Sequence, residues 1–259
     1  MQGEGPLDIL PLWAFGLGTL VLVLFAVEGG YRLGRRRWKQ TEHETEAPVG
    51  AMVGASLGLL AFMLAFTFGL AAQRYDRRRD LLVDEANAIG TAYLRAEMLP
   101  ERGAEIRSLL REYVEARLQA MRKEGVVEGV RRSERLQGQL WTEAAAVGQR
   151  NPTSIIVGLF VQSLNDVIDM HGKRLFADLR NRVPGIIWAA LFSIAFFSLA
   201  AMGYHSGISG TVRSISQLAV ALSFAAVIGL IADLDRPQAG TLTVSPQSLI
   251  DLQQSMSAP

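Results

Sequence analysis

Acidic side chains recur at helical spacing after residue 73. Asp76, Asp80 and Asp84 are four residues apart, so on a helix they would share one face and could hold a cation there. Arginines at 74 and 77–79 are interleaved with them, which favours a face of salt bridges instead. Asn87 stands among small residues and is a candidate buried polar residue, although close helix packing alone would explain that stretch. The candidate cluster consists of Arg74, Asp76, Arg77, Asp84, Glu85 and Asn87.

A stripe of aromatic rings precedes this cluster. Gly58, Phe62 and Phe66 are also four residues apart, on one face of a helix without charges. If several copies of this helix surrounded an axis, the rings would form an apolar constriction, of the kind that gates pores by dewetting. Ordinary packing or contact with lipid would produce the same stripe.

A third motif follows residue 232 and contains Asp233, Asp235, Arg236, Pro237 and Gly240. Two carboxylates at the C-terminal end of a helix oppose its macrodipole, so we expect a positive charge to offset them. The first candidates are Arg236 and the arginines at 77–79, and the second is a bound cation.

Composition excludes several classes of protein. The charge difference, 26 − 25 = +1, gives no bulk basicity for binding nucleic acid. Cysteine is absent, and the three histidines, His43, His171 and His205, fall in separate regions where we expect surface or interface residues and not ligands. We therefore expect no metal site and no cofactor. No nucleophile, base and orienting group form a recognisable set, so an enzyme is not expected.

Charge is segregated along the chain, because 20% of residues are charged and yet the mean hydropathy is +0.21. Four intervals of at least 19 residues carry no charge. A membrane-spanning helix needs about 20 predominantly apolar residues, so the sequence predicts four transmembrane helices. Their cores are Leu12–Val27, Val53–Ala72, Ile186–Tyr204 and Ile215–Ala232.

Residues 74–182 hold 19 of the 26 basic and 16 of the 25 acidic residues and form the soluble part. Apolar residues recur there at helical spacing, and no strand-like alternation appears. Four helices are expected, over 74–98, 101–123, 127–150 and from after the Asn151-Pro152 turn to about 182.

The expected fold is therefore an all-α integral membrane protein with four transmembrane helices and a large helical body between the second and third. Helices one and two with a basic connecting loop occupy 1–73, and the body, continuous with helix two, occupies 74–182. Helices three and four occupy 183–232. A polar tail, expected to fray, occupies 233–259.

Two longer blocks carry a family resemblance. The segment 64–95, LAFTFGLAAQRYDRRRDLLVDEANAIGTAYLR, and the segment 230–253, LIADLDRPQAGTLTVSPQSLIDLQ, resemble the bestrophin-like domain family of bacterial membrane proteins. Leu64-Ala65-Phe66 and Tyr75-Asp76-Arg77 also resemble bacterial bestrophins, as does the acidic-Pro-x-x-Gly element after the fourth span. Two features depart from the pattern. The Trp-rich segment of bestrophins is here Arg-Arg-Arg-Asp, and their acidic calcium clasp is reduced to Asp233 and Asp235, so calcium gating is not expected.

The resemblance implies a pentameric ion channel, anion-selective in its animal members, in which the second helices line a narrow hydrophobic neck. By position, Gly58, Phe62 and Phe66 would be that neck. The implied partners are the lipid bilayer, further copies of the chain and small inorganic ions. The implied location is the bacterial inner membrane with residues 74–182 in the cytoplasm, although the basic loop at 32–39 favours the opposite orientation.

A function of another class stays open. The chain could be a sensory or scaffolding membrane protein whose helical body binds a ligand or a partner protein, since a bare channel does not need a body of over 100 residues.

Overall fold

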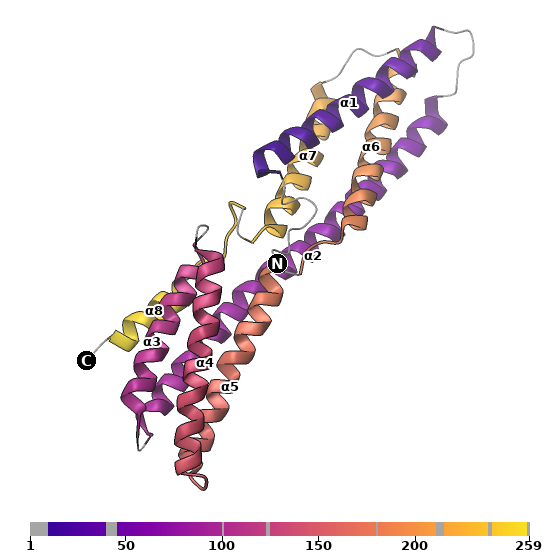
Figure 1. Cartoon of the computed structure of the whole chain (residues 1–259). Helices are drawn as coiled ribbons and strands as arrows, with labels where there is room; N and C mark the ends of the chain where they lie inside the picture. The colour runs from indigo at the N-terminus through magenta and orange to yellow at the C-terminus, as the bar shows by residue number, and fades with distance from the viewer. Residues whose placement is uncertain are drawn as a thin grey trace. The chain divides into compact units, whose positions relative to one another are not determined.

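The computed structural model describes residues 10–39, 46–99, 101–122, 125–179, 181–210, 215–237 and 240–257, which form eight α-helices and no strand. Four of these helices are long and apolar enough to cross a membrane. Figure 1 labels them along the chain. They are α1 (Leu12–Trp38), α2 (Glu46–Glu97), α6 (Gly185–Ile208) and α7 (Ile215–Asp235). The predicted all-α membrane fold with four spans is confirmed.

The chain divides into two compact units. The first, here called the membrane unit, comprises Met1–Arg74 and Arg182–Leu242, and the second, here called the body, comprises Tyr75–Asn181 and Thr243–Pro259. Helix α2 has 52 residues, more than twice the length that a span needs, and contributes to both units.

Glycines allow α1 and α6 to lie backbone against backbone within the membrane unit. A Cβ atom added at Gly30 or Gly34 of α1 would clash with a backbone carbonyl oxygen of α6. The same holds in the other direction for Gly203 and Gly207 of α6, which face carbonyl oxygens of α1. Small residues four apart permit such close approach of membrane helices.

One face of α2 is buried inside the membrane unit. Val53 of α2 shares a core cluster with Leu199 and Met202 of α6, and the backbone oxygen of Ser56 accepts a 3.0 Å hydrogen bond from Ser198 Oγ. These contacts determine which side of α2 remains uncovered.

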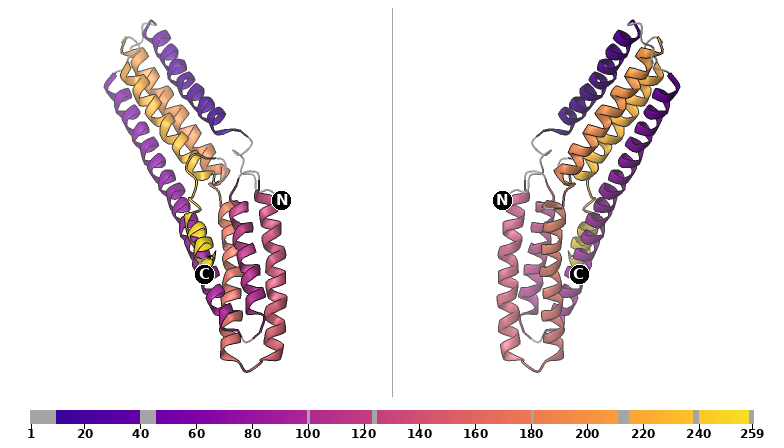
Figure 2. Two further views of the ribbon diagram at one scale, coloured as in Figure 1. Left: turned by 90° about the vertical axis from the view of Figure 1, so that its left-hand side faces the viewer. Right: turned by 90° about the vertical axis from the view of Figure 1, so that its right-hand side faces the viewer.

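The body is built around one hydrophobic core. Helices α3 (Gly103–Ala120), α4 (Val126–Arg150) and α5 (Ile155–Leu179) run side by side (Figure 2). Their apolar stripes meet that of α2 in a single cluster, which includes the predicted inward residues Leu82, Ile89, Leu110, Leu140 and Leu164.

The tail does not fray throughout, so that expectation is wrong for α8 (Gln247–Ser257). Leu249 and Met256 are buried in the body's core, and Tyr93 Oη of α2 donates a 3.2 Å hydrogen bond to the carbonyl oxygen of Met256. Leu249, Leu252 and Met256 are spaced three and four apart, which is enough to form one apolar helix face.

Candidate functional site

The predicted neck residues lie on the uncovered face of α2. Phe62 and Phe66 have 66% and 56% of their surface exposed, and a Cβ added at Gly58 would meet no atom within 4 Å. The opposite face, with Leu60 and Leu64, is buried in the membrane unit. Within one copy of the chain, the described residues therefore leave more than half of each of these two side chains exposed.

The charged cluster after residue 73 is spread around α2. Arg74 is half-buried, with Nη1 3.9 Å from Asp235 Oδ1, whereas Asp76, Arg77 and Asp84 are exposed. Asn87 is exposed as well, so its expected burial is wrong. It lies two residues before the buried Ile89, which places it on the other side of the helix.

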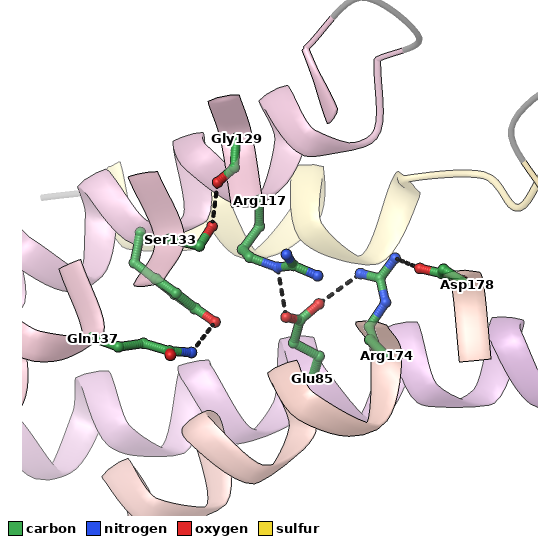
Figure 3. Close-up of polar contacts among 8 residues, drawn as sticks. Glu85, Arg117, Gly129, Ser133, Gln137, Arg174 and Asp178 are labelled. Carbon is green, nitrogen blue, oxygen red and sulfur yellow. Dashed lines mark hydrogen bonds and ion pairs between the residues drawn. The ribbon is translucent and has the colours of Figure 1, made fainter. Parts of the chain in front are cut away.

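Glu85 is the exception, because its side chain is entirely buried. Figure 3 shows it pointing toward Arg117 and Arg174. Its Oε1 accepts a 2.7 Å hydrogen bond from Arg117 Nε of α3, and its Oε2 accepts a 2.6 Å bond from Arg174 Nη1 of α5. Arg174 Nη2 also donates to Asp178 at 3.3 Å. The carboxylate of Glu85 thus connects α2 with α3 and α5 through two guanidinium groups. We call Glu85, Arg117, Arg174 and Asp178 the Glu85 cluster.

The carboxylates of the Glu85 cluster favour the charged form of the Arg174 guanidinium. Burial opposes the charge on Arg174, but the carboxylates of Glu85 and Asp178 outweigh it and raise the pKa of Arg174. Salt bridges are predicted from the sequence for the residues around Glu85, and Glu85 makes them, but its burial is not among those predictions. Glu85 lies three residues after Leu82 and four before Ile89, on the apolar stripe of α2. This spacing is typical of a buried side chain and could have indicated the burial of Glu85.

His171 lies beside this cluster on α5, one turn before Arg174. It is buried between helices of the body, where a surface or interface position was expected, and its ring meets that of Tyr113 edge-on with centroids 6.4 Å apart. Neither ring nitrogen has a hydrogen-bond partner among the described residues. Burial, and then the charge of Arg117, lower the pKa of His171 to about 4, so the imidazole is neutral at physiological pH. His43 lies outside the described residues.

Asp233 closes the loop after α7. Its Oδ1 accepts the backbone N–H of Thr241 at 2.5 Å, and its Oδ2 accepts the backbone N–H of Leu242 at 3.3 Å and the hydroxyl of Thr241. Gly240 is buried against the same carboxylate, where a Cβ would clash. The carboxylate of Asp233 thus accepts hydrogen bonds from N–H and O–H donors of the loop that follows it.

Asp235 and Arg236 connect distant segments of the membrane unit. Asp235 Oδ1 accepts the backbone N–H of Val183 at 2.9 Å, and the carbonyl oxygen of Asp235 accepts a hydrogen bond from Arg182. Arg236 Nη1 donates to the carbonyl oxygen of Leu10 at 2.7 Å. Together with Arg74 these residues form what we call the polar junction, which links the residues before α1 and α6, the end of α7 and the middle of α2. Pro237 is half-buried in the turn that follows.

The arrangement offers little for a metal ion. Among the described residues, no three His, Asp or Glu side chains gather closely enough to hold one. Both carboxylates that echo the calcium clasp are engaged by donors of the chain itself.

Comparisons with known proteins identify the family. A family model described as Bestrophin-like domain matches residues 20–249, whereas no curated protein matches. A solved bacterial Bestrophin homolog from Klebsiella pneumoniae, carrying a tyrosine-to-alanine substitution, is 16% identical with a TM-score of 0.67, covering 92% of this chain and 97% of that one. A second variant of that homolog, leucine to threonine, is 17% identical with a TM-score of 0.66, covering 95% and 97%.

A third solved structure, described as a membrane protein with a proline-to-alanine substitution, is 15% identical with a TM-score of 0.67, covering 95% of this chain and 97% of that one. Identities this low establish a shared fold alone. The family model, by contrast, covers most of the chain, and the chain therefore belongs to the bestrophin-like domain family.

Proposed function

We propose that this protein is an oligomeric ion channel whose hydrophobic neck is formed by Gly58, Phe62 and Phe66 of α2. The observation that carries the proposal is the uncovered face of α2, where two large rings stay exposed while the opposite face packs on α6. If copies of α2 surround an axis, their phenylalanine rings form an apolar constriction. Such a constriction excludes water, and so blocks ions, until the pore widens.

Small residues on the same face support assembly from several copies. Cβ atoms added at Gly54, Gly58 or Gly69 would meet nothing within 4 Å, so another copy of α2 can approach closely there. The family resemblance makes a pentamer the proposed stoichiometry.

The channel could select anions or cations, and we propose both alternatives for testing. Conduction of anions follows from the resemblance to animal bestrophins. Conduction of cations is favoured by a specific observation, the exposure of Asp76, Asp80 and Asp84 at intervals of four along the body segment of α2. Rings of carboxylates select cations in channels.

Purified protein in liposomes tests the proposal. We expect ionic flux, and we expect Phe66→Ala to increase it because the neck widens and hydrates. Phe197→Ala on α6 is the matched control, since Phe197 is 69% exposed and lies outside the neck, and it should leave flux unchanged. The reversal potential under a salt gradient distinguishes anions from cations. Absence of flux in a protein that purifies as a monomer would refute the channel and favour a sensory or scaffolding role.

The proposed location is the inner membrane, with the body in the cytoplasm. The chain has no native cysteine, so a single introduced cysteine reports its side unambiguously. Arg150 of α4 has an exposed side chain, and Arg150→Cys should be labelled by an impermeant maleimide only after the membrane is opened. Labelling of intact cells whose outer membrane has been permeabilised would reverse the proposed orientation.

A further inference from the structure

A groove opens between α1 and α7 of the membrane unit. Its volume is about 370 Å³, within the range of about 300–1,000 Å³ usual for ligand sites. Most of its lining is apolar, and the polar groups come from Glu28, Tyr31 and Gln217. The apolar lining residues are Leu24, Val27, Ile215, Leu218 and Ala221.

Positive charge follows the groove along α1. Counting from Glu28, the residues four, seven and eleven positions later are Arg32, Arg35 and Lys39, which fall on one face of the helix. Arg32 Nε donates to Glu28 Oε1 at 2.7 Å, with the Arg32 side chain 71% exposed. Three cations and one carboxylate leave a formal charge of 3 − 1 = +2 on this face.

An aromatic anchor stands at the same end. The guanidinium of Arg35 lies 4.7 Å from the centre of the Trp38 ring, and Arg35 Nη1 donates to the carbonyl oxygen of Gly210 at 3.2 Å. Tryptophan and arginine side chains are enriched where membrane helices reach the headgroup region. The apolar groove therefore ends at the depth where phosphate groups of lipids lie.

We infer that the groove between α1 and α7 binds an anionic glycerophospholipid. One acyl chain lies against Leu24, Leu218 and Ala221, and the phosphate is held at the end marked by Arg32, Arg35 and Lys39. Basic sites beside membrane helices attract anionic headgroups, whereas the apolar lining supplies chain affinity without headgroup preference. The inference is independent of ion conduction, because its test measures lipid binding.

The test is native mass spectrometry of the full-length protein, delipidated in detergent and titrated with phosphatidylglycerol or with phosphatidylcholine of the same acyl chains. We expect one saturable phosphatidylglycerol per chain, bound about tenfold or more tightly than phosphatidylcholine, as two net charges imply. Leu218→Trp, which fills the groove, should weaken both lipids by roughly tenfold through loss of buried apolar contact. Val220→Trp is its control, because Val220 is similarly exposed but lies across α7 from Leu218.

A second pair of variants tests the headgroup. Arg32→Gln combined with Lys39→Gln should remove the preference for phosphatidylglycerol while chain binding persists. Arg37→Gln, nine residues after Glu28 and so on the opposite side of α1, should keep the preference.

Several results would overturn the inference. One is equal affinity for the two lipids in the wild-type protein. Another is unchanged lipid binding in Leu218→Trp. A change in the number of copies per assembly in Leu218→Trp, with lipid binding intact, would identify the groove as a contact between copies instead. If Leu218→Trp does not fold, a photo-crosslinking phosphatidylglycerol should label peptides of α1 and α7 in the wild-type protein, and labelling elsewhere alone would contradict the site.

Discussion

Neutralising Glu85 tests the electrostatic account of the body directly. In Glu85→Gln the side chain keeps its size and one oxygen acceptor, but two guanidinium groups lose their shared counter-charge. The side chains of Arg117 and Arg174 are only 3% and 6% exposed, so water cannot replace the carboxylate. Removing one member of a buried ion pair costs about 3–5 kcal/mol. Arg174 keeps Asp178 as a partner, which places the expected loss near the lower figure.

Hydrogen exchange of the full chain in detergent micelles measures this loss where it occurs, through peptides of α3 and α5. A loss of about 3 kcal/mol in local stability speeds exchange by a factor of about 100 or more. Glu101→Gln is the matched control. Its bond to Arg150 has the same 2.7 Å length, but both side chains are more than half exposed, so the loss should stay below about 1 kcal/mol.

A third variant separates lost charge balance from lost packing. Replacing Glu85, Arg117 and Arg174 together by methionine removes all three charges and should recover much of the stability, because apolar residues of similar volume can replace a buried ion triad. Exchange in Glu85→Gln that stays within about threefold of the wild type, as in Glu101→Gln, would refute the reasoning.

Three further predictions concern other parts of the molecule. His171 is protonated near pH 6.5 in the unfolded chain but only near pH 4 in the folded chain. The free energy of unfolding is therefore highest above pH 6.5 and falls by up to about 3 kcal/mol as the pH drops from 6.5 to 4. In His171→Phe the thermal midpoint should change less between pH 7 and pH 5 than in the wild type. Gly203→Leu should cost about 3 kcal/mol and lower the thermal midpoint, whereas Gly16→Leu, with open space around it, should not. Gly240→Ala should loosen the loop held by Asp233, seen as faster exchange at residues 241–242.

The sequence predicted the helices well because each depends on local pattern. Four charge-free intervals identified the spans, and stripes such as Leu82 to Ile89 identified the inner faces of the body helices. Glu85 was misplaced because its partners Arg117 and Arg174 are 32 and 89 residues away, and no pattern within one helix names a partner on another.

Other features were missed for different reasons. The glycine pairs 30/34 and 203/207 show the small-x-x-x-small spacing typical of membrane helix contacts, so they were available to sequence reasoning. Helix α8 was overlooked because its apolar face has few residues, and only burial against α2 reveals its role. The roles of Gly58, Phe62 and Phe66 stay predictions, because one copy of the chain contains no axis for them to surround.

The polar junction has a consequence for how the protein is made. Leu10 and Arg236 are 226 residues apart, a distance that ribosomes cover in roughly 10–45 seconds. Throughout that interval α1 and the carbonyl group of Leu10 are already synthesised, whereas the Arg236 guanidinium that donates to this carbonyl does not yet exist. Because the bonds to Leu10 and Val183 both require residues at the end of α7, this junction forms only after the last membrane helix has been synthesised. A chain stopped before residue 233 therefore lacks the hydrogen bonds that Asp235 and Arg236 make to Val183 and Leu10.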